Sequence, residues 1–305
     1  LQLLLGHADT VWPVGTLERM PVRVEDGRLH GPGTCDRKAG LAMAAFALRA
    51  LSELGATPEV TPILFVSSDE EVGSAESRRW IEALARRVDR VWVLEPAYGE
   101  DGRIKTARKG VGEFVVRTLG RAAHAGLDPT AGVSAIVEMA HQIQRLTALN
   151  DPAEGVSVNV GMVEGGERPN VVAPLCSARV DVRAPTAESA RRLEDAILGL
   201  EPVLSGARLE VSGGVDRPPL ERTPANRRAW DAARAAGAEL GLELEEAAVG
   251  GGSDGNLTSP LAPTLDGLGA VGDGAHALHE HVRLDSLVPR TALLALLLLR
   301  PPLRP

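Results

Sequence analysis

The chain has 305 residues, of which 44% are apolar and 24% are charged, and its net charge is −8. This composition is typical of a globular protein, and the length is enough for one large domain or two. The acidic balance and the absence of a Lys/Arg block argue against nucleic acid as the main partner.

The cysteines and the apolar runs bear on the compartment of the protein and on membrane association. Cys35 and Cys176 are the only cysteines and lie far apart in the sequence, so a disulfide framework is not expected. This usage fits a reducing compartment, and we expect a cytoplasmic protein. The apolar run from Leu293 to Leu299 is too short to cross a bilayer and predicts a buried helix without membrane association.

The first predicted element is a strand over Leu1 to Leu5, which leads into His7 and Asp9. Side chains two residues apart share one face of a strand. A lone histidine in such a place is often a satisfied core residue. A His-x-Asp pair also suits a metal site, where the imidazole binds the ion and the carboxylate orients the ring.

A hairpin is predicted next, over Pro21 to His30, with Asp26-Gly27 as its turn. A glycine-rich loop then carries Asp36, and an apolar helix is predicted over Leu41 to Leu54. Asp36 could be the N-cap of that helix. The glycines also allow the loop to fold tightly around a ligand held by Asp36.

Two apolar runs that end in carboxylates are predicted to be strands. Val60 to Val66 predicts a buried strand, and after it Glu70 and Glu71 precede a helix predicted over Ala75 to Arg87. The run from Arg90 ends in the same way, at Glu95. Carboxylates in this position face the ligand crevice of an open α/β sheet, where neighbours can serve as metal ligand and general base. The alternative is a solvated turn with acidic residues near a helix N-terminus.

The segment from about Gly110 to Gly214 has a different pattern, strand-helix-strand-strand-helix-strand. This is the split βαβ order, so we predict an inserted ferredoxin-like α+β domain over residues 111–214. Residues 1–110 and 215–305 would then form one discontinuous domain. The strands of the inserted domain are predicted at 111–119, 155–163, 177–182 and 207–212, and its helices at 132–149 and 186–200.

The chain is predicted to return to the first domain through a helix over Pro224 to Leu240. A loop with three glycines, which includes Gly251, and the following Ser253 could bring backbone N–H groups close to a ligand. His276 then supplies a second imidazole before the closing helix.

Taken together, the polar side chains could surround one crevice and hold two divalent cations. Nitrogen and carboxylate donors without thiolate suit zinc and tolerate cobalt or manganese. Three carboxylates and a hydroxide would balance the charge of two such cations, which a buried site requires. Asp36 is the carboxylate that we expect to bridge them. The predicted donors are His7, Asp36, Glu71, Glu95 and His276.

The motifs that carry these residues resemble those of one family. They are similar to the dinuclear zinc metallopeptidases that include glutamate carboxypeptidase, acetylornithine deacetylase, succinyl-diaminopimelate desuccinylase and aminoacylase, with the glutamate carboxypeptidase branch closest. The resemblance implies an α/β fold, with a mixed-sheet catalytic domain and an inserted lid and dimerisation domain. The motifs, in chain order, are Gly6-His7-Ala8-Asp9-Thr10-Val11, Gly31-Pro32-Gly33 with Asp36 and Lys38, Asp69-Glu70-Glu71-Val72-Gly73-Ser74, Leu94-Glu95-Pro96, Gly250 to Asp254, and His276 to Glu280.

The resemblance also assigns roles within the metal site. It implies one cation held by His7 and Glu95 and a second held by Glu71 and His276, with Asp36 between them. Glu70 would be the general base that takes a proton from the metal-bound water, while Asp9 supports His7. A non-proline cis peptide bond after Asp36 is expected as well.

Residues for substrate binding are implied in the inserted domain. His124 would stabilise the oxyanion in the active site of a neighbouring subunit, so a homodimer is expected. Asn170 and Arg183 resemble a substrate-binding polar pair, and Arg217 resembles a residue that grips a substrate carboxylate. Without the resemblance, each of the last three could equally be a surface or structural residue.

The predicted function is therefore hydrolysis of an amide or peptide bond next to a free carboxylate, with a small peptide or N-acyl amino acid as substrate. A deacylase of N-acyl amino acids is the alternative within the family, and a non-catalytic, metal-binding dimer is the alternative outside enzymes. The family has several dozen residues before the His-x-Asp strand that are absent here, so the chain is either a fragment or has a trimmed fold. A trimmed domain would expose a sheet edge or an apolar face. His281 stands where the family has an aromatic residue, and Cys35 is expected to serve packing only.

Overall fold

A computed structural model describes residues 1–303 of the chain. The chain divides into two compact units. The first contains Leu1–Arg108, Leu220–Val249 and the chain from Ser253 onward, and the second contains Lys109–Pro219 with Gly250–Gly252.

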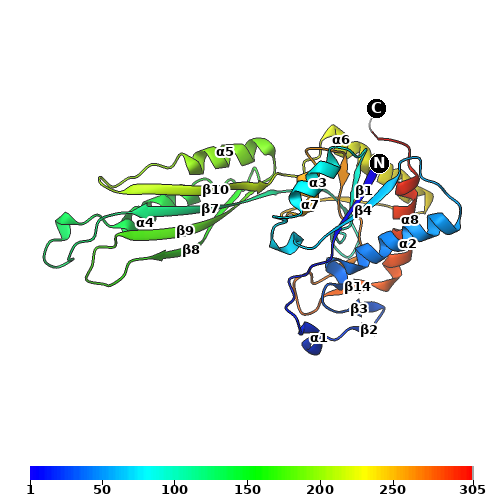
Figure 1. Ribbon diagram of the computed structural model, residues 1–305, viewed down its shortest axis with the longest axis horizontal. Coiled ribbons are helices and arrows are strands. Elements are labelled where there is room, and N and C mark those ends of the chain that lie inside the picture. Colours follow the sequence, from blue (N-terminus) through cyan, green and yellow to red (C-terminus); the bar gives the residue numbers. More distant parts are fainter. Residues whose placement is uncertain (304–305) are drawn as a thin grey trace. The chain divides into compact units, whose positions relative to one another are not determined.

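A parallel sheet forms the centre of the first unit, with the strand order β12-β5-β1-β4. Figure 1 labels two of its strands, β1 and β4. Every residue of β1 is buried, as expected for a strand with neighbours on both sides. The carboxyl ends of β1, β4 and β5 meet at one edge of the sheet, so the residues that follow them lie close together. The strands are β1 Gln2–His7, β4 Pro62–Ser67, β5 Val91–Val93 and β12 Thr264–Leu265.

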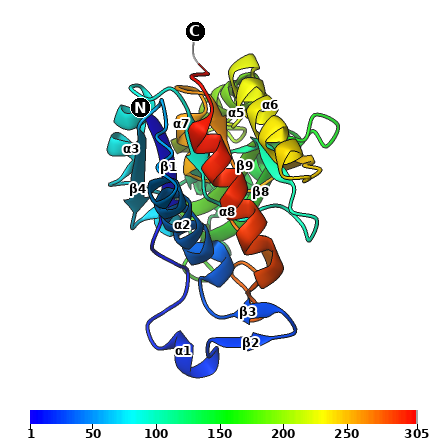
Figure 2. The same ribbon diagram turned by 90° about the vertical axis from the view of Figure 1, so that its right-hand side faces the viewer.

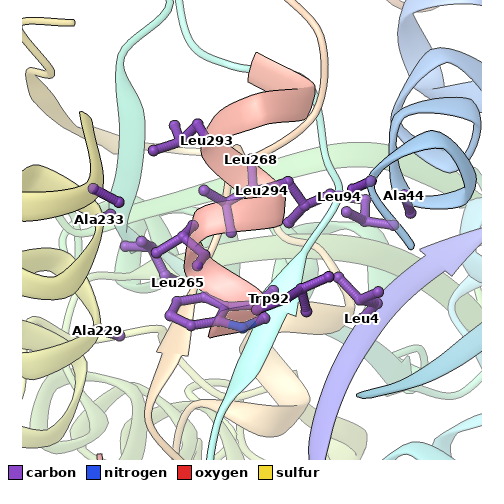
Figure 3. Close-up of a cluster of buried hydrophobic side chains, with 14 of the residues drawn as sticks. Leu4, Ala44, Trp92, Leu94, Ala229, Ala233, Leu265, Leu268, Leu293 and Leu294 are labelled. Atoms are coloured by element: carbon purple, nitrogen blue, oxygen red, sulfur yellow. The ribbon is translucent and has the colours of Figure 1, made fainter. Parts of the chain in front are cut away.

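Helices cover both faces of this sheet. On one face, α2 (Ala39–Glu53), α8 (Leu284–Leu299) and α6 (Pro224–Glu239) lie side by side (Figure 2). Their apolar residues pack around Trp92 and Leu94, as Figure 3 shows. On the other face, α3 (Arg78–Ala85) and α7 (Asp254–Thr258) pack against the remaining strand side chains.

A small antiparallel sheet, β13-β14-β3-β2, carries the loops that lead to the site. β2 and β3 form the predicted hairpin, and its turn residues Asp26 and Gly27 both have positive φ angles, as a tight two-residue turn requires. The remaining elements of the unit include a short parallel pair, β6 with β11. Their bounds are β2 Arg23–Glu25, β3 Arg28–His30, β13 Gly272–Asp273, β14 His281–Arg283, β6 Ile104–Arg108, β11 Glu246–Val249 and α1 Thr16–Arg19.

The second unit is a four-stranded antiparallel sheet with two helices on one face. The helices pack on Phe114 and Val180 in a single apolar core. The element order confirms the predicted β-α-β-β-α-β layout, while the role of a lid stays a prediction. The elements are β7 Gly110–Leu119, α4 Ala135–Thr147, β8 Ser157–Gly165, β9 Leu175–Ala184, α5 Ala187–Leu198 and β10 Arg208–Arg217, in the sheet order β10-β7-β9-β8, with a short turn at Pro129–Ala131.

Two elements differ from the prediction. β4 was expected to be buried but lies at the edge of its sheet, which leaves Leu64 40% and Val66 43% exposed. An apolar run does not reveal whether a strand is central or at an edge. The helix expected from residue 75 begins at Arg78, because Asp69 Oδ2 accepts hydrogen bonds from the backbone N–H groups of Glu76 (2.8 Å) and Ser77 (3.1 Å) and holds the chain before it in a turn.

None of the described helices is both long enough and apolar enough to span a membrane.

Candidate metal centre

The site begins at the end of β1, where His7 is 1% exposed. Its Nδ1 lies 3.3 Å from Asp9 Oδ1 and 3.0 Å from the Asp9 carbonyl oxygen. A proton on Nδ1 can be donated to the Asp9 carbonyl oxygen, which leaves Nε2 to bind a cation. Asp9 Oδ2 also accepts the backbone N–H of Glu71 at 2.9 Å, so Asp9 supports two of the predicted ligands.

Asp36 lies in the tight turn Thr34–Lys38 at the start of α2. The peptide bond from Asp36 to Arg37 is cis, as predicted. The two carboxylate oxygens of Asp36 point to different histidines: Oδ1 lies 3.3 Å from His7 Nε2, and Oδ2 lies 3.4 Å from His276 Nε2. Asp36 therefore stands between the two imidazoles as a bridging carboxylate would.

The second imidazole comes from the loop between β13 and β14. His276 has a positive φ of 65°, which a non-glycine residue rarely adopts, and such conformations are concentrated at functional sites. Its Nε2 lies 3.2 Å from Glu71 Oε2. Glu71 itself sits in the short turn Glu70–Val72 that follows β4.

Glu95 completes the set from the chain after β5. Its Oε1 lies 3.7 Å from His7 Nε2 and accepts a hydrogen bond from Arg37 Nη1 at 2.5 Å. The Arg37 guanidinium is fully buried and also donates to the Leu5 carbonyl oxygen. Arg37 therefore holds Glu95 in place and compensates part of the negative charge of the site.

The distances between these donors match those between ligands that share one ion. Donors about 2.0–2.1 Å from a tetrahedral zinc ion lie about 3.3 Å apart. One set, His7, Asp36 and Glu95, has donor separations of 3.3 and 3.7 Å, and the other, His276, Asp36 and Glu71, has separations of 3.4 and 3.2 Å.

Buried oxygens without partners support the same interpretation. Glu71 Oε1 and Asp36 Oδ1 are buried and accept no hydrogen bond from the described residues. A buried carboxylate oxygen normally has a donor or a cation beside it. Ligand atoms of His7, Asp36 and Glu71 lie within 4.8 Å of one another. The residues present therefore fit a metal centre.

Burial and neighbouring charges shift the pKa values of the ligands. Burial raises the pKa of Glu71, and the charge of Asp36 raises it further. Burial alone would lower the pKa of His7, but the adjacent Asp36 carboxylate and other nearby carboxylates raise it to about 9. The protonated imidazole thus replaces, in the metal-free protein, part of the positive charge that a cation would bring.

Glu70 adjoins Glu71 in the same turn, and its carboxylate contributes to the raised pKa of His7. It is half-buried. Glu70 is thus next to a predicted metal ligand in the chain, and its role as general base stays a prediction.

Most of the predicted substrate residues belong to the second unit and are described within it. His124 is exposed, and its Nδ1 accepts hydrogen bonds from the backbone N–H groups of Gly126 and Leu127, which places the proton of the neutral ring on Nε2. The exposed Asn170 lies beside this segment, because the Ala125 N–H donates to the Asn170 carbonyl oxygen. Arg183, on β9, instead forms a two-pronged ion pair with Asp181.

The remaining predicted binding residues are Arg217, Gly251 and Ser253, which differ in burial and in the unit to which they belong. Arg217 is buried at the end of β10. Gly251 groups with the second unit, whereas Ser253 is buried in the first. The Ser253 hydroxyl donates to Asp266 Oδ2 at 2.6 Å and accepts the Gly255 N–H, so it caps α7.

Cys35 is buried among apolar side chains, and burial followed by the charge of Glu280 raises the pKa of its thiol to about 12. It therefore stays protonated and serves packing, as expected. His281 is buried, with its ring 5.2 Å from that of His30, and does not reach the donor sets described above.

Two cationic residues near the site, Arg37 and Lys105, were not among the site residues predicted from the sequence. Arg37 has no local signal of burial, because its partners lie 32 and 58 residues away. Lys105 is on β6, a strand that was not predicted. Burial and then the charge of Arg108 lower the pKa of Lys105 to about 8, against the opposing charges that include Glu95.

Replacing Arg37 by methionine should lower the free energy of unfolding of the metal-free protein by about 3–5 kcal/mol, because a buried carboxylate would lose its partner. Bound metal should restore part of the loss by replacing the missing positive charge. Urea unfolding with and without Zn²⁺ measures both effects. Arg49→Met is the control, since the Arg49–Glu53 pair on α2 is exposed and should contribute less than about 1 kcal/mol. Equal effects of the two substitutions would contradict the role assigned to Arg37.

The sequence and the fold were compared with known protein families, curated proteins and solved structures. The family model for peptidase family M20/M25/M40 matches residues 3–300. Carboxypeptidase G2 from Pseudomonas sp. (strain RS-16) is 30% identical over 302 residues, which cover 96% of this chain and 72% of that protein. Acetylornithine deacetylase from Salmonella paratyphi B is 32% identical over 196 residues, 59% of this chain and 49% of that protein. The crystal structure of aminopeptidase PepT from Bacillus cereus ATCC 10987 matches in fold, with a TM-score of 0.76, 23% identity, and coverage of 97% of this chain and 80% of that one.

Proposed function

The chain belongs to peptidase family M20/M25/M40, and we propose that it hydrolyses an amide or peptide bond next to a free carboxylate with the help of two divalent cations. The observation that carries the proposal is the position of Asp36. Its two oxygens lie 3.3 and 3.4 Å from His7 and His276, and each histidine has its own additional carboxylate. Such an arrangement can hold two ions on one shared ligand.

When bound, two zinc ions, or cobalt or manganese ions, would polarise the scissile carbonyl and lower the pKa of the attacking water. Glu70 takes a proton from that water as its oxygen bonds to the carbonyl carbon. The bond from carbon to nitrogen then breaks, and Glu70 returns the proton to the leaving amine. Asp9 keeps the His7 tautomer that can bind a cation, and Arg37 keeps Glu95 in position.

The nature of the product rests on the relatives. Similarity to carboxypeptidase G2 over nearly the whole chain favours release of an amino acid with a free carboxylate. Similarity to acetylornithine deacetylase favours the second candidate, removal of an acyl group from an N-acyl amino acid. Both reactions need the same chemistry and differ only in the pocket, which selects the acyl group and the amino acid.

A panel of matched substrates tests the proposal. Zn²⁺- and Co²⁺-loaded protein would be given N-acyl-glutamates, N-acetyl amino acids and dipeptides, each with a free carboxylate or as the carboxamide, and release of the primary amine would be measured. We expect the carboxamide to lower kcat/KM by at least about 100-fold, because groups that recognise the carboxylate would lose their charged partner.

Equal rates for the acid and the carboxamide would contradict the proposal that the protein recognises a free carboxylate on its substrate. A preference for small N-acyl groups, whatever the amino acid, would favour the deacylase. No hydrolysis by protein that has bound both cations would instead support a metal-binding protein without turnover.

A further inference from the structure

Glu280 is a fully buried carboxylate at the end of the loop that carries His276. Its two oxygens accept four hydrogen bonds, two on each oxygen. Oε1 accepts the backbone N–H groups of Cys35 (2.9 Å) and Asp36 (3.0 Å), and Oε2 accepts the N–H of Gly33 (2.9 Å) and the indole N–H of Trp12 (2.8 Å). The acceptor capacity of an ionised carboxylate is thereby used in full.

Three of these donors belong to the turn that ends in Asp36. The turn is thus wrapped around the Glu280 carboxylate, as backbone N–H groups wrap around a bound anion. A further hydrogen bond, from Gly31 N–H to the Glu280 carbonyl oxygen (3.2 Å), joins the same two segments. The backbone position of Asp36 is therefore set from the opposite loop.

That loop also fixes His276. Ala277 N–H donates to the Gly274 carbonyl oxygen, and Glu280 N–H donates to the Ala277 carbonyl oxygen, so residues 274–280 form two linked turns. His276 lies within the first of these turns. One carboxylate thus connects the segment of the bridging ligand with the segment of its imidazole neighbour.

We propose that Glu280 is a positioning residue for the metal centre. It sets the spacing between the Asp36 turn and the His276 loop, so that Asp36 Oδ2 and His276 Nε2 remain 3.4 Å apart. The inference rests on the two-cation site of the proposed function. It predicts that Glu280 matters more for the cation held by Asp36, Glu71 and His276 than for the cation at His7 and Glu95. The last two ligands are positioned by the central strands, because His7 ends β1 and Glu95 follows β5.

Glu280→Gln is the sharpest substitution, because it keeps the size of the side chain. Both oxygens of Glu280 accept two N–H groups, so the amide NH₂ would face two donors in either orientation of the glutamine. The Asp36 turn must then shift. Supporting residues around a metal site typically change metal affinity by about 10–100-fold when replaced.

Glu138→Gln provides a matched control in the second unit. Glu138 is also fully buried and accepts the backbone N–H groups of Val203 (3.0 Å) and Leu204 (2.7 Å) as well as the Gln142 side chain (2.6 Å). Its replacement imposes the same kind of stability loss far from the metal ligands in sequence.

The test is a competition titration of metal-free protein with Zn²⁺ and a chromogenic chelator, with Co²⁺ absorption as the second readout. Wild type and Glu138→Gln should bind two cations alike, and Glu280→Gln should bind the second about 10–100-fold more weakly. If Glu280→Gln does not fold, Trp12→Phe removes one donor while keeping the carboxylate, and it should weaken the second cation several-fold.

Unchanged binding of both cations by Glu280→Gln, or by Trp12→Phe where that variant is used, overturns this inference alone. An equal loss in Glu138→Gln overturns it too, because the effect would then follow general stability. Wild type that binds fewer than two cations overturns the proposed function together with this inference.

Discussion

Replacing Glu70 by glutamine should lower kcat for amide hydrolysis by about 10²–10⁴-fold while both cations stay bound. The glutamine has nearly the same size but cannot take a proton from the attacking water. Glu70 stands beside Glu71 in the turn after β4, and the donor separations of the metal centre do not involve it. The substitution therefore separates proton transfer from metal binding.

Metal content by mass spectrometry and steady-state kinetics measured on the same preparation would check this result. KM should change much less than kcat, because Glu70 acts on the proton and not on the resting substrate. Glu76→Gln, an exposed glutamate six residues on, should keep full activity. Glu70→Gln with more than about a tenth of wild-type kcat would place the base elsewhere.

The segments that meet at the site could be predicted because parallel strands end at a common edge. His7 ends β1, and Glu71 and Glu95 follow β4 and β5 of the same sheet. A local apolar run is enough to find such a strand. The tight turn at Asp36 could be expected from Gly31 and Gly33. Both glycines have positive φ, and their conformations bring Asp36 to the strand ends.

What surrounds the ligands could not be predicted from local patterns. The partners of Arg37 and Glu280 lie tens to hundreds of residues away, so their burial depends on the finished fold. The same reason explains β4, whose sequence predicts a buried strand although it lies at the edge of its sheet. The partner of Arg183 is local, since Asp181 is two residues away, and its predicted role in substrate binding stays a prediction.

Replacing Asp36 by asparagine should cause the largest loss of metal. Asparagine offers one oxygen and an NH₂ group that does not bind cations, so it can serve only one of the two donor sets. Oδ1 lies beside His7 and Oδ2 beside His276, so in the proposed site each set takes one oxygen of this residue. We expect one cation instead of two, and a loss of kcat/KM greater than about 100-fold, the upper end for residues that merely support ligands.

The metal-free form of Asp36→Asn gives an independent signature. Burial opposes protonation of His7, and the Asp36 carboxylate beside its Nε2 is the main influence that raises the pKa of His7 to about 9. Without that carboxylate, the pKa of His7 should fall, as NMR titration of the imidazole would show. In wild type, binding of a cation below pH 9 must displace the His7 proton, so metal affinity should decrease as the pH is lowered. Asp36→Asn should move that decrease to lower pH, whereas an unchanged His7 titration would mean that Asp36 and His7 do not interact in solution.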